Sequence, residues 1–291
     1  MSIYQSALVA TFALGSMISS DAANAPSLTF KFSRVNVPGA QQTSPTGINN
    51  AGMTVGQYVD KSNAPHGYIL SGKKLTTLDD PNGTNTWVSG IQYNGKNVVG
   101  FYTNSNGATV GFLHKGATFT DVPGPSGATA SSAFGINDAG AIVGYYVDSK
   151  GTTHGFLLNG KNYRTLDVPG ASSTVAAGIN NKGNIVLYWV NSKDIIEASI
   201  YDGKTYKTIN VPGAFTSYPN GLDNQGDVSY MWLDSAGICR GALLRGGKYY
   251  KFDYPKAYFT YAGGINDKSM IVGGYQAALG MPFSGFKATF K

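Results

Sequence analysis

The sequence predicts an all-β fold, a six-bladed β-propeller with four-stranded blades, and three observations support this prediction. A Gly-Ile-Asn-like tripeptide occurs six times at intervals of 43 to 45 residues, a period typical of propeller blades. The 291 residues include 39 Gly and 19 Tyr but few charged side chains, a composition that suits tight hairpin turns and half-buried strands. No segment shows sustained helical periodicity. The tripeptides begin at Gly47, Gly90, Gly135, Gly178, Gly221 and Gly264.

The clearest copy of the repeat covers residues 133–169 and indicates how one blade is built. It contains four short β-prone runs, and each junction between them carries residues typical of hairpin turns, such as Asn-Asp-Ala-Gly. Four strands joined by three hairpins make one propeller blade. The expected strands are residues 133–137, 141–148, 154–159 and 163–168.

The two ends of the repeat predict how the ring closes. After Gly264 the last copy supplies only three predicted strands, whereas residues 28–39 match the fourth-strand pattern of residues 163–170. We therefore expect the N-terminal strand to complete the C-terminal blade, which also hides strand edges that would otherwise pair with other chains. A parallel β-helix is the alternative, although its coils are usually shorter and need no shared final unit.

Residues 1–25 differ in composition from the rest of the chain. The apolar run at 7–18 is too short to span a bilayer, and small residues follow it with potential cleavage points after Ala22 or Ala25. We interpret this segment as a secretory signal peptide, which makes residues 26–291 one propeller domain in a secreted, periplasmic or extracellular location without a transmembrane span. Because the usual positively charged start is missing, a disordered or structural N-terminus is the alternative.

The repeat motifs resemble those of the HAF family of extracellular repeat proteins. That family carries a Gly-Ile-Asn, a Gly-x-Ile-Val-Gly-x-Tyr and a His-Ala-Phe-like element. The resemblance covers about residues 28–291 and implies a secreted, propeller-like protein, but it implies no particular activity. The matching segments are residues 135–137, 140–146 and 154–156, echoed by residues 47–49, 55–58 and 66–68; the fourth copy departs most, at residues 186–189 and 197–198.

Lysines gather in the predicted turns between first and second strands and between third and fourth strands, which lie on one face of a propeller. This basic face could dock an anionic polysaccharide, lipid headgroups or nucleic acid, or the lysines could simply keep a sheet protein soluble. Nucleic acid is the least expected partner because aromatic residues do not interleave with the lysines. The basic face comprises Lys73, Lys74, Lys96, Lys115, Lys161, Lys182, Lys204, Lys248 and Lys268.

The first residue of the third strand varies unusually between blades, within surroundings that are otherwise uniform. Histidine, glutamate and arginine at such a position could take part in acid–base chemistry or bind anions. Alternatively, these side chains decorate blade edges or pair with their neighbours. The six residues are His66, Val110, His154, Glu197, Arg240 and Ser284.

An aromatic residue ends the second strand of every predicted blade. Such residues bind sugars by stacking on their apolar faces, and one per blade would give a multivalent lectin. Alternatively, each ring wedges between adjacent blades. The six candidate ligand-binding residues are Tyr58, Tyr102, Tyr146, Trp189, Trp232 and Tyr275. The Asx residues of the tripeptides, such as Asn137, are better explained as turn formers than as metal ligands.

Standard catalytic signatures and metal-binding spacings are missing from the sequence, and the single cysteine, Cys239, excludes both an internal disulfide and a cysteine-based metal site. We therefore expect no cofactor or metal and consider a secreted, non-catalytic module that binds glycans or another cell-surface ligand. The alternative is a carbohydrate hydrolase or lyase with one pocket built from His66, His154, Glu197 and Arg240, although Glu197 is the only glutamate. A structural scaffold with a basic docking face is the third hypothesis.

Overall fold

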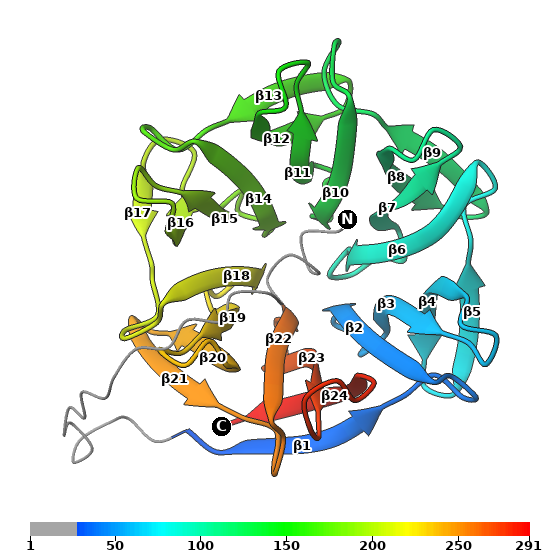
Figure 1. The fold of residues 1–291 in the computed structure, drawn as a ribbon, viewed down its shortest axis with the longest axis vertical. Coiled ribbons are helices and arrows are strands. Elements are labelled where there is room, and N and C mark those ends of the chain that lie inside the picture. The colour runs from blue at the N-terminus through cyan, green and yellow to red at the C-terminus, as the bar shows by residue number, and fades with distance from the viewer. Residues whose placement is uncertain (1–27) are drawn as a thin grey trace.

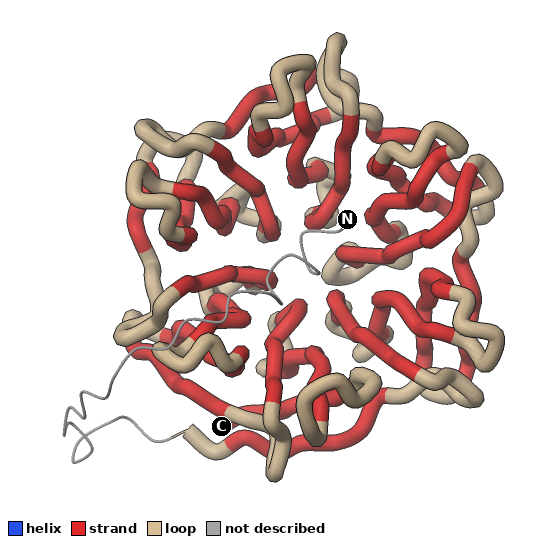
Figure 2. Tube along the Cα trace, viewed as in Figure 1, coloured by secondary structure: helices blue, strands red, loops and turns tan. Residues whose placement is uncertain are grey.

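In the computed structural model, which describes residues 28–291, six antiparallel four-stranded sheets surround a common axis (Figure 1). Strands and the loops between them account for all of these residues (Figure 2), so the predicted all-β, six-bladed propeller is confirmed. The predicted signal peptide, residues 1–25, lies outside the described residues. No helix within residues 28–291 is long and apolar enough to cross a membrane.

Each blade takes its strands in chain order from the axis outwards, except that β1 supplies the outermost strand of blade 6. Blade 1 comprises β2 (Gln42–Ile48), β3 (Thr54–Val59), β4 (Pro65–Ser71) and β5 (Lys74–Leu78). Blade 2 comprises β6 (Gly83–Ile91), β7 (Val98–Asn104), β8 (Thr109–Lys115) and β9 (Thr118–Val122). Blade 3 comprises β10 (Ala130–Ile136), β11 (Ile142–Val147), β12 (Thr153–Asn159) and β13 (Asn162–Leu166).

The remaining three blades follow the same plan. Blade 4 comprises β14 (Ser173–Ile179), β15 (Ile185–Val190), β16 (Ile196–Tyr201) and β17 (Tyr206–Thr208). Blade 5 comprises β18 (Thr216–Leu222), β19 (Val228–Leu233), β20 (Cys239–Arg245) and β21 (Lys248–Phe252). Blade 6 comprises β22 (Phe259–Asn266), β23 (Met270–Gln276), β24 (Ser284–Phe290) and β1 (Phe30–Val35).

The ring closes where β1 pairs antiparallel with β24, at the meeting of the blue and red ends of the ribbon (Figure 1). Aromatic packing reinforces these hydrogen bonds, since the ring of Phe30 lies 4.5 Å from that of Phe252 in blade 5, centroid to centroid. Phe32 meets Phe286 edge to face at 5.5 Å. The predicted closure by the N-terminal strand is therefore confirmed.

Close contact between first strands explains the tripeptide glycines of blades 5 and 6, Gly221 and Gly264. A Cβ atom on Gly264 would lie only 2.9 Å from the Cα atom of Gly47, and one on Gly221 would lie 2.8 Å from the backbone nitrogen of Ile265. Real Cβ atoms essentially never approach another atom this closely. These glycines are therefore required by backbone packing at the axis.

The asparagine of the tripeptide connects neighbouring blades as well as closing its own turn. In blade 3, Oδ1 of Asn137 accepts a hydrogen bond from the backbone N–H of Ala141 at 3.0 Å. Its Nδ2 donates to the carbonyl oxygen of Asn180 in blade 4 at 3.3 Å, and Asn180 donates in the same way to Asp223 of blade 5 at 3.0 Å. These buried bonds fix blade 3 relative to blade 4 and blade 4 relative to blade 5.

Alanine at two positions of the glycine ring should affect stability unequally. Gly264→Ala should lower the free energy of unfolding by about 1–3 kcal/mol, because its Cβ atom meets backbone on the neighbouring blade. Gly178→Ala is the matched control, since its Cβ atom would lie 3.2 Å from the end of the Val186 side chain and no closer than 3.6 Å to the backbone of the neighbouring blade. Urea unfolding measures both. Equal midpoints for the two variants would contradict the packing explanation.

Candidate functional site

The two rings of candidate residues predicted from the sequence lie side by side in every blade. The aromatic residue of the second strand is the direct cross-strand partner of the varied residue on the third strand, which places their Cβ atoms about 5 Å apart. We call each such pair, with the residues that contact it, a blade site. The pairs are Tyr58–His66, Tyr102–Val110, Tyr146–His154, Trp189–Glu197, Trp232–Arg240 and Tyr275–Ser284.

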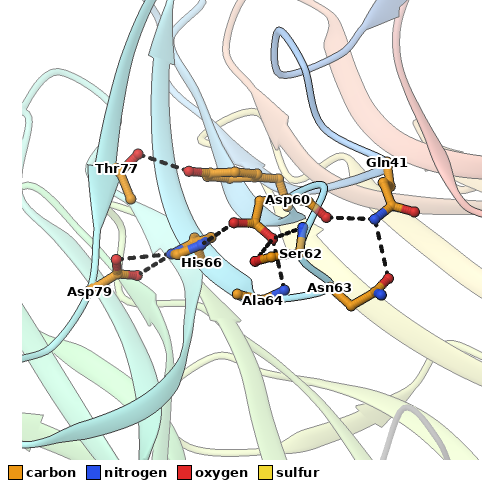
Figure 3. A network of polar contacts seen from close by, with 9 residues as sticks. Gln41, Asp60, Ser62, Asn63, Ala64, His66, Thr77 and Asp79 are labelled. Atoms are coloured by element: carbon orange, nitrogen blue, oxygen red, sulfur yellow. Dashed lines mark hydrogen bonds and ion pairs between the residues drawn. The ribbon is translucent and has the colours of Figure 1, made fainter.

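The blade 1 site holds a histidine between two carboxylates (Figure 3). Nδ1 of His66 lies 2.9 Å from Oδ2 of Asp79, which follows β5, and Nε2 lies 3.5 Å from Oδ2 of Asp60 in the β3–β4 turn. The imidazole stacks on Tyr58 with a centroid separation of 5.1 Å. The Tyr58 hydroxyl is bonded to Oγ1 of Thr77 at 3.0 Å. The site therefore presents an aromatic ring beside a polar network.

Asp60 is held in its place by the turn that it closes. Its Oδ1 accepts hydrogen bonds from the hydroxyl and backbone N–H of Ser62 and from the N–H of Ala64. The bonds from Ser62 and Ala64 outweigh partial burial and lower the pKa of Asp60 to about 2. Asp60 is thus ionised at neutral pH and offers a fixed negative charge to His66.

Blade 3 repeats this arrangement. Nδ1 of His154 lies 2.8 Å from Oδ2 of Asp167, Nε2 lies 3.5 Å from Oδ2 of Asp148, and the imidazole stacks on Tyr146 at 5.1 Å. Burial alone would lower the pKa of His154, but hydrogen bonds and charge attraction from Asp167 and Asp148 raise it above its usual value. The network therefore favours the protonated imidazolium.

Blade 5 places an arginine in the same position. Nε of Arg240 lies 3.2 Å from Oδ2 of Asp234, and Nη1 lies 3.0 Å from Oδ2 of Asp253. The aromatic partner, Trp232, is covered by the ammonium group of Lys251, which lies 4.3 Å from the ring centroid. Blades 1, 3 and 5 thus share a basic side chain between two aspartates.

Blades 2, 4 and 6 lack this arrangement. Their third-strand residues are Val110, Glu197 and Ser284, none of which is basic. Glu197 instead accepts a hydrogen bond from Nδ2 of Asn191 at 2.6 Å. The propeller therefore alternates between two kinds of blade site around the ring.

The aromatic residues also pack against neighbouring blades. Tyr102, Trp232 and Tyr275 are buried, and each belongs to a hydrophobic cluster that joins its own blade to the preceding one. Tyr58 and Tyr146 are half-buried at the margin of such clusters, and Trp189 is half-buried as well. The rings thus contribute to the interblade core, and those of Tyr58, Tyr146 and Trp189 also keep an accessible part.

The structure does not bring together the four residues considered for a single catalytic pocket. His66, His154, Glu197 and Arg240 lie on the third strands of blades 1, 3, 4 and 5, away from the axis, and each contacts partners within its own blade. The four strands belong to four different sheets of the ring (Figure 1). Each of these residues therefore belongs to a separate site.

The lysines of the basic face are all exposed and lie in or beside the turns predicted for them, on the face opposite to the turns between second and third strands.

Within residues 28–291 there is no group of three or more histidine, cysteine or acidic residues that could hold a metal ion.

Sequence reasoning missed the aspartates of the blade sites, although their spacing is regular. In blades 1, 3 and 5 the first aspartate lies six residues before the third-strand residue, and the second lies thirteen residues after it. Aligning the copies on the third-strand residue reveals this pattern. The aspartates are Asp60, Asp79, Asp148, Asp167, Asp234 and Asp253.

The fold of the chain is similar to that of several solved structures. The SapL1 lectin in complex with α-methyl fucoside is 12% identical, with a TM-score of 0.55 over 85% of this chain and 94% of that one. AofleA from Arthrobotrys oligospora is 12% identical, with a TM-score of 0.54 over 90% and 86%. A mutant of the Aleuria aurantia lectin AAL in complex with Fucα1-6GlcNAc is 15% identical, with a TM-score of 0.46 over 72% and 77%. No protein-family model matches the sequence, and no curated protein is significantly similar to it.

The raised pKa of His154 leads to a prediction. Asp167→Asn should lower this pKa, because it removes the largest attractive contribution to the imidazolium, and NMR titration of the imidazole protons measures the change. The folded state favours protonated His154, so this contribution to stability is complete below the ordinary imidazole pKa and is lost as the pH rises through the raised value. His114, whose pKa burial lowers, should titrate unchanged. An unaltered His154 titration in Asp167→Asn would refute the proposed coupling.

Proposed function

We propose that this protein is a secreted, non-catalytic module that recognises glycans through its blade sites. The observation that carries the proposal is the register that pairs an aromatic residue with the varied third-strand residue in all six blades. In this proposal residues 1–25 direct secretion, as in the HAF-type repeat proteins that the sequence resembles. Mass spectrometry of the exported protein should then find an N-terminus just after Ala22 or Ala25.

The chemistry of the sites in blades 1 and 3 suits sugars. A sugar combines apolar C–H faces with hydroxyl groups, and it is bound well by an aromatic surface beside fixed hydrogen-bonding groups. Tyr58 and Tyr146 supply the aromatic surface, while Asp79 and Asp167 supply exposed carboxylate oxygens. Weak binding at several equivalent sites would add up through avidity on a multivalent glycan.

Two further observations favour binding over catalysis. The residues considered for a hydrolase or lyase are distributed over separate blades, whereas an enzyme needs its acid, base and substrate in one place. The SapL1 lectin shares the propeller fold and is described in complex with α-methyl fucoside. This likeness concerns the fold alone, so fucose is one candidate sugar to be tested among others.

The basic face supports a second role. Its exposed lysines lie in turns on one side of the ring, where they would attract an anionic polysaccharide or membrane surface. Such docking would be non-specific and would weaken steeply with ionic strength, unlike binding at the blade sites.

A glycan array followed by calorimetry on the bound sugar tests the main proposal. Tyr58→Ala combined with Tyr146→Ala should weaken binding about tenfold, because the stacking surface is lost from two sites. Tyr58→Phe with Tyr146→Phe is the matched control, since it keeps both rings and removes only the hydroxyl bonds to Thr77 and Thr165. It should bind nearly as well as the natural sequence.

The same sugars should be recovered unchanged after prolonged incubation with the protein. If the protein releases products from these sugars, and His154→Ala or Glu197→Ala abolishes the release, the result would contradict the lectin proposal and support a hydrolase or lyase. Equal affinities for the alanine and phenylalanine pairs would show that the aromatic residues only pack between blades.

A further inference from the structure

Blade 6 departs from the pattern of blades 1, 3 and 5 and carries a hollow of about 470 Å³ at its site. The hollow lies between blade 6 and the linker that follows β21, and it is lined by residues from β1, β23, β24, this linker and the β23–β24 loop. The lining residues that matter here are Arg34, Tyr254, Lys256, Tyr275, Met281 and Ser284.

The register shows which charges have changed in blade 6. Arg34 faces Phe286 across the β1–β24 pair as Thr77 faces Tyr68 in blade 1, so an arginine occupies the position of a threonine. The two aspartates are replaced as well. Ala277 follows Tyr275 at the interval that separates Asp60 from Tyr58, and Asn36 follows β1 as Asp79 follows β5. Blade 6 thus has a basic side chain on β1 instead of on its third strand, and it lacks both carboxylates.

The hollow therefore contains positive charge that the protein itself does not neutralise. Neither Arg34 nor Lys256 takes part in any ion pair found among residues 28–291, and the lining of the hollow includes no acidic residue. By contrast, Arg240 in blade 5 contacts two aspartates. Arg34 is bonded to the Tyr254 hydroxyl and lies beside Tyr275, interactions that raise its pKa.

The backbone at Lys256 provides an independent observation. Its φ angle is +62°, in the left-handed region that side chains other than glycine, asparagine and aspartate rarely adopt. Four other linkers have glycine after the corresponding proline, with φ between +73° and +88°, at Gly39, Gly124, Gly170 and Gly213. The linker before β22 thus has a lysine in a strained backbone conformation that glycine would adopt without strain. Backbone strain of this kind concentrates at binding sites.

The walls of the hollow are apolar beside these charges. The rings of Tyr254 and Tyr275 stack with a centroid separation of 3.7 Å and an interplanar angle of 7°. Met281 is 52% exposed on the β23–β24 loop. Aromatic and thioether groups next to a guanidinium suit a ligand with an apolar face and one negative charge.

We infer that the blade 6 hollow binds an acidic sugar residue, a pyranose that carries a carboxylate group. Arg34 is the residue that forms two parallel hydrogen bonds with the carboxylate, and Lys256 adds a second positive charge. The sugar ring lies against Tyr254 and Met281. The small side chain of Ser284 leaves space for it at the position that histidine or arginine occupies in blades 1, 3 and 5. This inference rests on the proposed glycan recognition and assigns a ligand class to one of its sites.

Calorimetry with a galacturonic acid trisaccharide and its fully methyl-esterified form tests the inference. The natural sequence should bind the acid, and the ester about tenfold or more weakly, because esterification removes the charge but keeps the sugar. Arg34→Gln should weaken binding of the acid to a similar extent. Lys31→Gln is the matched control, since Lys31 is exposed on the same strand, outside the hollow, and loses the same charge.

Lys256→Gly tests the strained position. It should weaken binding of the acid while leaving the unfolding midpoint unchanged or raised, because glycine relaxes the backbone. Acid binding that is equal in Arg34→Gln and the natural sequence, ester binding as tight as acid binding, or no acid binding at millimolar concentrations would each overturn the inference.

Tryptophan fluorescence separates this inference from the general glycan proposal. The three tryptophans lie in blades 2, 4 and 5. Binding of the acidic trisaccharide in blade 6 should therefore be detected by calorimetry without a change in tryptophan emission. Neutral sugars that bind elsewhere while the acid fails would overturn the blade 6 site alone. Acid binding that depends on Arg34, with no glycan bound at any other blade, would support the blade 6 site and contradict the multivalent lectin.

Discussion

The close approach of the six first strands at the axis is the constraint on which the rest of the propeller depends. Glycine is needed where neighbouring backbones meet, as at Gly264 beside Gly47, and the nearby Asn266 donates a hydrogen bond to the carbonyl oxygen of Asn49 in the next blade. A second set of Asx side chains, in the turns that follow the first strands, also joins neighbouring blades. Asn50 donates a hydrogen bond to Asp267, and Asn181 donates one to Asp138. The tripeptide is therefore scaffold, and its burial leaves the outer strands free to vary.

This arrangement determines where variation can have a function. The first strand fixes the register of the second, and the second fixes that of the third, so corresponding residues keep their relative positions around the ring. Blades 1, 3 and 5 use one such position for a basic side chain that lies between two aspartates. The basic side chain of each of these sites therefore has acidic partners within its own blade. A blade that keeps the geometry and loses the aspartates, as blade 6 does, presents uncompensated positive charge to a ligand.

Much of this structure could be predicted from the repeat alone. The blade count, the four-strand plan and the closure by β1 follow from a period and from the missing fourth strand after Gly264. Contacts across the ring could not be predicted in this way. Tyr93 lies in the β6–β7 turn, which is one residue longer than its counterpart in blade 1, and its hydroxyl donates to the carbonyl oxygen of Leu222 in blade 5. Only the closed ring brings these residues together, since 129 positions separate them in the chain.

The contacts within the blade sites likewise could be predicted only in part from the sequence. Alternating strand patterns indicate which residues share a face, but hydrogen bonds between side chains depend on turn geometry. Asp60 reaches His66 because its turn returns the chain within six residues, and Asp79 does so from beyond a further hairpin. Whether a repeated position serves packing or binding therefore depends on its partners. In blade 1 the charge of His66 has acidic partners within the blade, so a ligand there meets the accessible part of the aromatic ring and the exposed carboxylate, whereas Arg34, whose partners have been replaced, has charge available for a ligand.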